Sequence, residues 1–504
     1  MKLNKLGHSK IEKLYTLLLI LLIGIQPVLE LVWLNDGTFG EIAGFTIPTL
    51  VRFGLVGAIG IFSFFVVRFN KRYIWLAVYA IVVIIYAIFH NIYCTDFHSL
   101  IPGDFGYNWL QELFYLIRML VPIAVIYFVY NSKITAKMFK MLAVGISLFS
   151  SLIIIITNIT KTALGSYSDT RILGNIFDWF LNKGEYTFND LASKGFFYWS
   201  IYSTVLVLLY PYLIYLYFKE RKKRYLGLIA LQGIALYMFG TKATTFSVVI
   251  ELVIMLAVYV FCTLIKKDDK FSARLSIPLV AVILGAFIIF PSTPAISRIA
   301  FDKEYQKEID AGEDKKGEDI EDIESYIAEN YSELSIKEEF ILDSYNYKYD
   351  PDFWQEILNE LGPSQRMQNR IIEQRMLERV KEINNDPMDD YFGLGYTRTS
   401  NIYNLERDFL YQYYSLGIIG VILFLGPYIG ILLIAMALMI IKFKEKGTVL
   451  NCSFVLGIGL SLFLAYYSGN VMDNLGITIL LAFVTGYLLR EICGKTERSE
   501  KTES

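Results

Sequence analysis

Charged residues are scarce in this chain. They make up 19% of its 504 residues, against about 25% in ordinary soluble domains, whereas 55% of the residues are hydrophobic. The mean hydropathy is +0.44. These values exclude a soluble protein with a single core and indicate a chain made largely of membrane-spanning segments.

Cysteine and histidine are also rare. The three histidines give little support to imidazole-based metal chemistry. The cysteines lack the paired spacing of a disulfide framework or a zinc site. They are Cys94, Cys262, Cys452 and Cys493. The sequence therefore predicts no metal site and no cofactor.

An excess of positive charge is missing as well. The chain has 47 Lys and Arg against 49 Asp and Glu, a net charge of -2. Proteins that bind nucleic acid neutralise phosphates with basic side chains, and no glycine-rich phosphate loop follows a strand pattern here. We therefore expect no nucleic-acid partner.

Long apolar runs dominate the chain. A membrane helix needs about 20 apolar residues, because the hydrocarbon core is roughly 30 Å thick and a helix rises about 1.5 Å per residue. The runs predict an all-α polytopic membrane protein with about twelve spans. These are 14–34, 45–67, 73–91, 109–130, 139–161, 196–218, 225–240, 243–266, 275–297, 409–441, 449–468 and 471–490. The seventh is short, and the tenth is long enough for a surface helix followed by a membrane helix that begins near Gly417.

Lys and Arg in the short loops predict the orientation, because cytoplasmic loops retain them. The basic loops begin at Arg68, Asn131, Lys219, Lys266 and Lys442. The loops without Lys or Arg begin at Leu34, Asn91 and Ser468. With twelve spans every short loop obeys the rule, which predicts a multi-pass plasma-membrane protein with both termini in the cytoplasm.

Two segments on the outer side are too long to be turns. Residues 1–297 are predicted to hold nine spans with an external loop at 162–195. Residues 298–408 form a large external loop domain between spans nine and ten, and 409–490 hold the last three spans. The polar residues 491–504 form a cytoplasmic tail.

The large loop contains an expected amphipathic helix. Its apolar residues recur at helical spacing and are Met367, Ile371, Met376, Val380 and Ile383. Its other faces carry Arg366, Arg370, Arg375 and Arg379. The helix is either a solvated cover on the membrane domain or a basic lid over a phosphate-bearing ligand.

Five ionisable residues fall inside the predicted spans, where charge is costly and usually faces a cavity or a partner. They are Glu30, Arg52, Glu112, Arg118 and Glu251. The predicted orientation places all five in the outer half of the bilayer or near its middle. This asymmetry predicts a polar cavity that opens outward and no pathway that crosses both leaflets.

Several cations are expected near that cavity. Arg171 lies in the first long loop and Lys242 at an outer helix turn. With Arg52 and Arg118 they suit a substrate that carries a pyrophosphate, because one guanidinium group can bind two phosphate oxygens in bidentate fashion.

Structural readings of the same cations remain open. Arg52 would pair with Glu30 inside the protein, and Arg118 would pair with Glu112 or Glu251. Lys242 would extend from a helix end to the membrane interface.

Short motifs occur in a fixed order from residue 160 to residue 490. The first long loop holds Arg171, Gly174, Asn189 and Ala192 ahead of a membrane helix. The later motifs are Thr241 with Lys242 at an outer turn, the Gly-x-Gly element Gly393 and Gly395, and the Gly-x-x-Gly element Gly417 and Gly420. In order and spacing, this set resembles the O-antigen ligase and polymerase superfamily.

The chain departs from that superfamily at two places. Lys242 stands where the family usually has an Arg, which keeps the charge and loses the planar fork. Glu406 and Arg407 stand where lipopolysaccharide ligases often have a His-Asn pair. The Glu-x-Asp pattern of Glu406 and Asp408 resembles the branch found with cell-wall and capsular polysaccharide genes of Gram-positive bacteria.

The resemblance implies a GT-C-like, metal-independent glycosyltransferase in the lipid of the bacterial plasma membrane. Its donor would be an undecaprenyl-diphosphate-linked saccharide, and its acceptor a glycan or a lipid-linked glycan at the outer face. Because the acceptor hydroxyl must lose a proton, a carboxylate would act as base, Glu406 first and Asp408 second. Arg52, Arg118, Arg171 and Lys242 would hold the diphosphate.

Other readings of the sequence remain. Either carboxylate would instead cap the start of the tenth span. Twelve helices with buried charges also suit a lipid-linked saccharide flippase or a secondary transporter, although such a protein needs access from both sides. An adaptor that recruits wall enzymes through its acidic segment is a third class. Ligase and polymerase are not distinguished.

Overall fold

The computed structural model describes residues 2–36, 38, 45–67, 71–182, 184–266, 272–311 and 320–494. These residues are almost entirely helical. The long helices are α1 (Lys2–Leu29), α3 (Ile47–Val67), α4 (Lys71–Thr95), α5 (Trp109–Tyr130), α6 (Ala136–Ile159), α9 (Ser203–Glu220), α10 (Lys223–Met238), α11 (Lys242–Phe261), α12 (Ala273–Ile289), α13 (Pro294–Asp310), α17 (Asn369–Asn384), α20 (Asp408–Phe424), α21 (Gly426–Ile441), α23 (Val449–Ser468) and α24 (Leu475–Cys493).

Shorter elements connect them. They are α2 (Val32–Asn35), η1 (Asp104–Gly106), β1 (Leu164–Gly165), α7 (Asp178–Leu181), α8 (Phe188–Leu191), β2 (Ser193–Gly195), η2 (Ser200–Tyr202), η3 (Cys262–Lys266), η4 (Phe290–Ser292), α14 (Ile323–Asn330), η6 (Tyr331–Glu333), η7 (Phe340–Ser344), α15 (Pro351–Glu360), α16 (Pro363–Arg366), α18 (Asp389–Phe392), α19 (Tyr396–Ile402) and α22 (Phe443–Lys446). β1 and β2 pair antiparallel.

Eleven helical stretches of the described residues are long and apolar enough to cross a membrane. The seventh predicted span is α10, which has 16 residues and is therefore shorter than a bilayer requires. The prediction of an all-α polytopic membrane protein is confirmed. α9 and α24 lie at the centre of the bundle and bury nearly every side chain, as expected for helices that are apolar on all faces.

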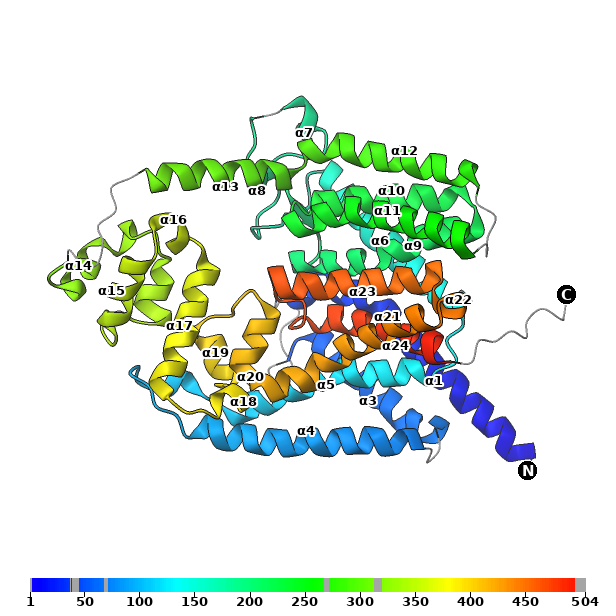
Figure 1. Cartoon of the computed structure of the whole chain (residues 1–504), viewed down its shortest axis with the longest axis horizontal. Helices are drawn as coiled ribbons and strands as arrows, with labels where there is room; N and C mark the ends of the chain where they lie inside the picture. The colour runs from blue at the N-terminus through cyan, green and yellow to red at the C-terminus, as the bar shows by residue number, and fades with distance from the viewer. Residues whose placement is uncertain are drawn as a thin grey trace.

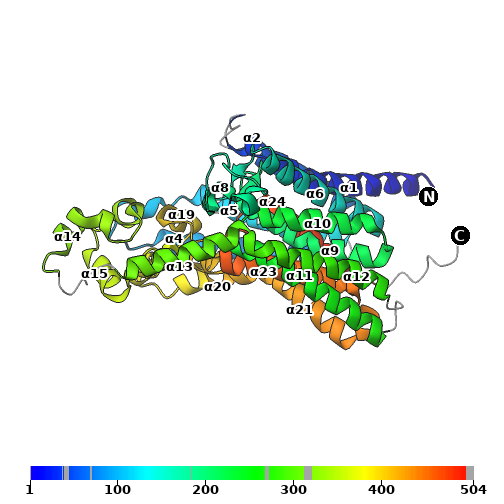
Figure 2. The ribbon, with the colours of Figure 1, turned by 90° about the horizontal axis from the view of Figure 1, so that it is seen from above.

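A helical unit formed by α14–α19 lies at one end of the bundle, while α1 begins and α24 ends at the opposite end (Figure 1). The view from above gives the same arrangement (Figure 2). The unit has its own hydrophobic cluster, which includes Phe340, Trp354 and Met376. The same cluster includes Tyr411 and Tyr414 of α20, so the unit has a core apart from the bundle core and is joined to the bundle through α20.

The expected amphipathic helix is α17, with α16 just before it. Its buried face contains Ile372, Met376, Leu377 and Val380. Met376 and Val380 were expected there. Ile371 lies only at the edge of that face, half-buried, because the buried stripe is rotated toward Ile372 and Leu377.

The tenth predicted span is broken at Gly417, as expected. Gly417 has φ 67° and ψ 179° and divides α20 into 408–416 and 418–424. Its Cα faces the backbone of Tyr391, with no space for a Cβ. The amides of Leu394 and Gly395 donate to the carbonyls of Tyr414 and Ser415 at 2.7 and 3.0 Å.

Two glycine motifs that are separate in sequence thus form one backbone junction. Gly393 and Gly395 have φ of 81° and 97°, a region that glycine enters without a steric penalty. Gly420 lies against the phenol of Tyr86 from α4. The junction attaches α18 and α19 to the break in α20.

We expect Gly417→Ala to destabilise the protein strongly. A backbone with φ 67° and ψ 179° is open almost only to glycine and costs about 1–3 kcal/mol for a residue with a side chain, and the contact with Tyr391 adds to this. Gly430→Ala in α21 is the matched control, because a Cβ there meets nothing within 4 Å. Thermal unfolding in nanodiscs measures both, and equal unfolding temperatures for the two variants would contradict the expectation.

Candidate functional site

The short loop 468–474, which begins at the last residue of α23 and ends before α24, contacts Arg118 of α5, Asp408 of α20 and Glu30 at the end of α1. It lies at the end of the bundle that faces the α14–α19 unit (Figure 1). Gly469 has φ 67° and lies directly against the backbone of Glu406. In sequence this loop was noticeable only for its lack of Lys and Arg. Its contacts make it the centre of the candidate site.

Asp408 anchors this loop. Its side chain is buried, and one carboxylate oxygen accepts hydrogen bonds from the amides of Val471 and Met472 at 2.8 and 3.0 Å. The other oxygen has no hydrogen-bond partner in the described part of the chain. Asp408 therefore positions the loop and does not cap its own helix, because α20 has Arg407 at the N-cap and no side-chain cap.

Arg118 is held by the same loop. Its guanidinium donates to the carbonyl of Asp473 at 2.5 Å and lies 3.5 Å from the Asp473 carboxylate. The Tyr115 hydroxyl donates to that carboxylate at 3.0 Å, and the Tyr115 ring stacks on Tyr396 at 3.6 Å. A quarter of the Arg118 side chain stays exposed, so the cation is fixed and still reachable.

The alternative pairing of Arg118 with Glu112 or Glu251 is not the one in the structure, where Arg118 pairs with Asp473. Glu112 and Arg118 are six residues apart on α5 and leave different faces of the helix. Glu112 instead accepts from the amide and hydroxyl of Thr397, at 2.5 and 2.8 Å, and lies 3.2 Å from His90. Both carboxylate oxygens of Glu251 are buried without a hydrogen-bond partner among the described residues.

Arg52 and Glu30 form a buried pair. The guanidinium of Arg52 contacts the Glu30 carboxylate and donates to Gln26 at 2.9 Å. Asn474 donates to Glu30 at 3.3 Å. The structure thus has the ion pair that was the alternative to diphosphate binding, and it connects α1 and α3 to the start of α24.

Lys242 belongs to a different cluster. Its ammonium donates to Asp302 of α13 at 2.8 Å, and Arg298 lies 3.8 Å from the same carboxylate. The Arg298 guanidinium lies 4.3 Å above the ring of Tyr167, whose hydroxyl donates to the carbonyl of Gly240. The sequence reasoning missed Arg298, which adds a second cation beside Lys242.

Three predicted residues of the first long loop, Arg171, Gly174 and Asn189, have different surroundings. Gly174 packs closely on Leu191 and leaves no space for a Cβ. Arg171 and Asn189 are exposed. No hydrogen bond or ion pair in the described ranges links the side chain of Arg171 to Arg118 or to Glu406.

Glu406 lines an open cavity. Half of its side chain is exposed, and Arg370 of α17 donates to it at 2.7 Å. The cavity has a volume of about 320 Å³. It is lined by Glu339, Ser344, Ser400, Asn401, Ile402, Tyr403, Asn404, Glu406 and Asn470. Glu406 is therefore the accessible carboxylate and Asp408 the enclosed one.

Glu373 is a second carboxyl beside Glu406, and the sequence reasoning missed it. It is buried on the apolar face of α17 and accepts from the backbone amide of Glu406. Burial, followed by the negative charge of Glu406, raises the pKa of Glu373 to about 7. A carboxylate inside an apolar stripe is the signal that would have identified it.

These features define a class: a polytopic membrane protein with cations and carboxylates gathered at one end. Residues 12–494 match the family described as O-antigen ligase like membrane protein, and the chain belongs to this family. Membership supports glycan processing in a membrane by a glycosyltransferase-like ligase activity, with lipid-linked saccharide and glycan substrates. No curated protein matches the chain.

We expect the stability of the protein to fall as the pH rises from about 5 to about 8. The folded state keeps the Glu373 proton up to about pH 7, while an unfolded Glu loses it near 4.5, so the folded state binds more protons in this window. The shift corresponds to roughly 3 kcal/mol.

Glu373→Gln should remove the part of this dependence that Glu373 contributes, because the amide has no proton to lose in this range. Asp389, whose pKa burial raises to about 6, contributes in the same window and is unchanged in this variant. Thermal unfolding in nanodiscs at pH 5, 6.5 and 8 measures it, with the exposed Glu338→Gln as control. An unchanged pH profile in Glu373→Gln would refute the assignment.

Proposed function

We propose that this protein transfers or polymerises saccharide from an undecaprenyl-diphosphate donor onto a glycan acceptor at the outer face of the plasma membrane. One observation supports this above the others. A reachable cation, Arg118, and a carboxylate in an open cavity, Glu406, are held by the same loop 468–474. Departure of a diphosphate and deprotonation of a hydroxyl need this pair of groups.

The proposed orientation places the α14–α19 unit outside and both termini in the cytoplasm. Lysines of the basic loops lie near the helix ends remote from that unit. Lys133 donates to Glu12 of α1 at 2.6 Å, and Lys446 donates to the carbonyl of Glu491 near the end of α24 at 2.7 Å. The positive-inside rule assigns this end to the cytoplasm.

Glu406 acts as the base in this proposal. It takes the proton from the acceptor hydroxyl while the hydroxyl oxygen bonds to the anomeric carbon and the bond from that carbon to the diphosphate breaks. Arg370 orients the carboxylate. Asp408 positions loop 468–474 and is the weaker candidate, because its carboxylate is buried and bonded to backbone amides.

Arg118 stabilises the negative charge on the departing diphosphate. Arg171 and Lys242 are proposed to contact the same donor. Arg52 positions Glu30 and has no proposed contact with the donor. Because the cations are side chains, the proposed reaction needs no metal. The sugar and its linkage are left open.

Glu406→Gln should lower turnover by about 10²- to 10⁴-fold, the usual contribution of a positioned base. The assay reconstitutes the protein with a lipid-diphosphate oligosaccharide and an acceptor and follows release of undecaprenyl diphosphate. Glu338→Gln, an exposed carboxylate of the same unit, is the control. Full turnover in Glu406→Gln would eliminate this base.

Arg118→Gln should lower the catalytic rate by about 10²- to 10³-fold, as for removal of one donor to a developing oxyanion. Arg118→Lys should recover part of it, because charge returns without the fork. If the protein moves labelled lipid-linked saccharide across vesicles and releases no diphosphate lipid, the flippase or transporter reading replaces ours.

A further inference from the structure

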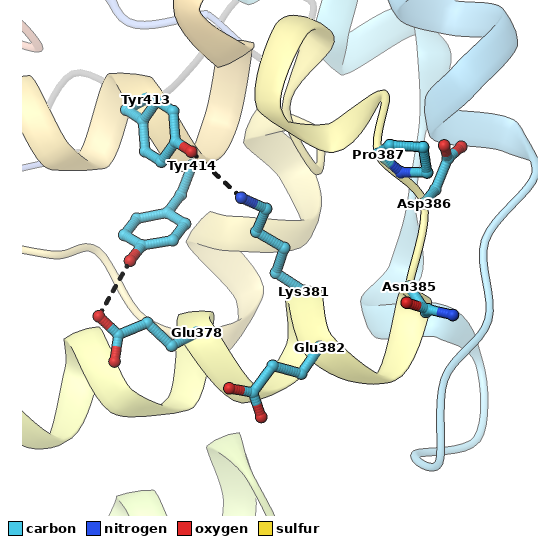
Figure 3. Close-up of a pocket in the computed structure, with 8 residues that line it drawn as sticks. All are labelled: Glu378, Lys381, Glu382, Asn385, Asp386, Pro387, Tyr413 and Tyr414. Carbon is cyan, nitrogen blue, oxygen red and sulfur yellow. Dashed lines mark hydrogen bonds between the residues drawn. The ribbon is translucent and has the colours of Figure 1, made fainter.

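A second cavity lies between α17 and α20, separate from the one that Glu406 lines. Its volume is about 430 Å³. It is lined by Glu378, Lys381, Glu382, Asn385, Asp386, Pro387, Tyr413 and Tyr414. Figure 3 shows the two tyrosines facing the α17 side chains, with Asn385–Pro387 closing one side. The proposed reaction uses none of these residues.

The charge of the lining selects against anions. Glu378, Glu382 and Asp386 contribute carboxylates. The single cation, Lys381, contacts the carboxylate of Asp390 and lies 3.1 Å from the Tyr413 hydroxyl. A phosphate or a uronic acid would meet net negative charge and no free cation among these residues, and like charges repel.

The polar groups of the lining suit hydroxyl groups. Carboxylates accept hydrogen bonds only, and an amide such as that of Asn385 both donates and accepts. Within the described ranges, the three carboxylates are not grouped closely enough to hold a metal ion. A neutral ligand rich in hydroxyl groups can donate hydrogen bonds to these carboxylates and exchange them with the Asn385 amide.

Tyrosine rings supply the apolar part. Tyr414 is buried and donates to Glu378 at 3.3 Å, which fixes its ring at the base of the cavity. Tyr413 is half-buried, with its hydroxyl held by Asp390 and Lys381. An aromatic ring fixed at its hydroxyl end offers a rigid face to the C–H surface of a sugar ring.

Helix α17 contacts Glu406, which lines one cavity, and itself lines the other. Arg370 and Glu373 contact Glu406 near its beginning, and Lys381 lines the second cavity. Eight residues separate Glu373 from Lys381, a distance of about 12 Å along a helix. A glycan chain of a few sugars would span the two sites.

We propose that the cavity at Tyr413 and Tyr414 is a saccharide subsite, which binds an uncharged segment of the glycan while another part of it lies at Glu406. This rests on the proposed function, because the ligand is the glycan of that reaction. Tyr413 is the specificity-determining residue through its ring.

The test measures binding of three tetrasaccharides to the full protein in nanodiscs by saturation-transfer NMR. The probes are maltotetraose, chitotetraose and tetragalacturonate. We expect at least one uncharged probe to bind and the anionic probe not to bind. Tyr413→Ala should weaken binding about tenfold, while Tyr413→Phe, which keeps the ring, should retain most of it. Tyr349→Ala is the matched control, because Tyr349 is exposed on the same unit and lines neither cavity.

Three results would overturn the subsite: no binding of either uncharged probe, stronger binding of the anionic probe, or equal binding by Tyr413→Ala and wild type. Glu406→Gln separates the two proposals, since it should lose turnover and keep binding. Turnover in the wild type with no probe binding refutes the subsite alone. Probe binding at Tyr413 without any release of diphosphate lipid refutes the proposed function alone.

Discussion

A charge inside a membrane helix is costly unless it finds a partner, and this constraint organises one end of the molecule. Asp408 bonds the amides of loop 468–474, Arg118 bonds Asp473 in it, and the Arg52–Glu30 pair reaches Asn474. Loop 468–474 thus bonds charged groups of α5, of α20 and of the end of α1. The open position of Glu406 depends on it, because Gly469 packs against the Glu406 backbone.

The local sequence pattern predicted most of the membrane-spanning helices, but few of the ion pairs between them. Apolar run length identifies a span, since it depends on bilayer thickness, and even the break at Gly417 was visible. The partner of Arg118 was not, because Asp473 lies 355 residues away and only packing brings it there. Arg52 and Glu30 were predictable as a pair, since they come from adjacent spans at the same depth.

The arginines of α17 show how one pattern can have two readings. Arg370, Arg375 and Arg379 each contact a carboxylate: Glu406, Glu360 and Asp350. Those contacts favour a cover on the bundle over a basic lid, because the guanidinium groups are occupied. Glu373 was not predicted from the sequence. A single carboxylate within an apolar stripe has no evident role until the fold brings Glu406 beside it.

The backbone junction at Gly393, Gly395 and Gly417 fixes the chain just before it returns to the bundle. His90 contacts the carbonyl of Phe392 at 2.6 Å, and Arg398 donates to the carbonyl of Cys94 at 3.1 Å. The path from Leu394 to Glu406 is thereby tied to α4, and the bond between Thr397 and Glu112 ties it to α5. Consequently, insertions or deletions in the part of the α14–α19 unit before α17 would leave Glu406, the proposed base, in register. Under the proposed function, evolution can then alter which glycan is recognised without rebuilding the groups assigned to bond breaking.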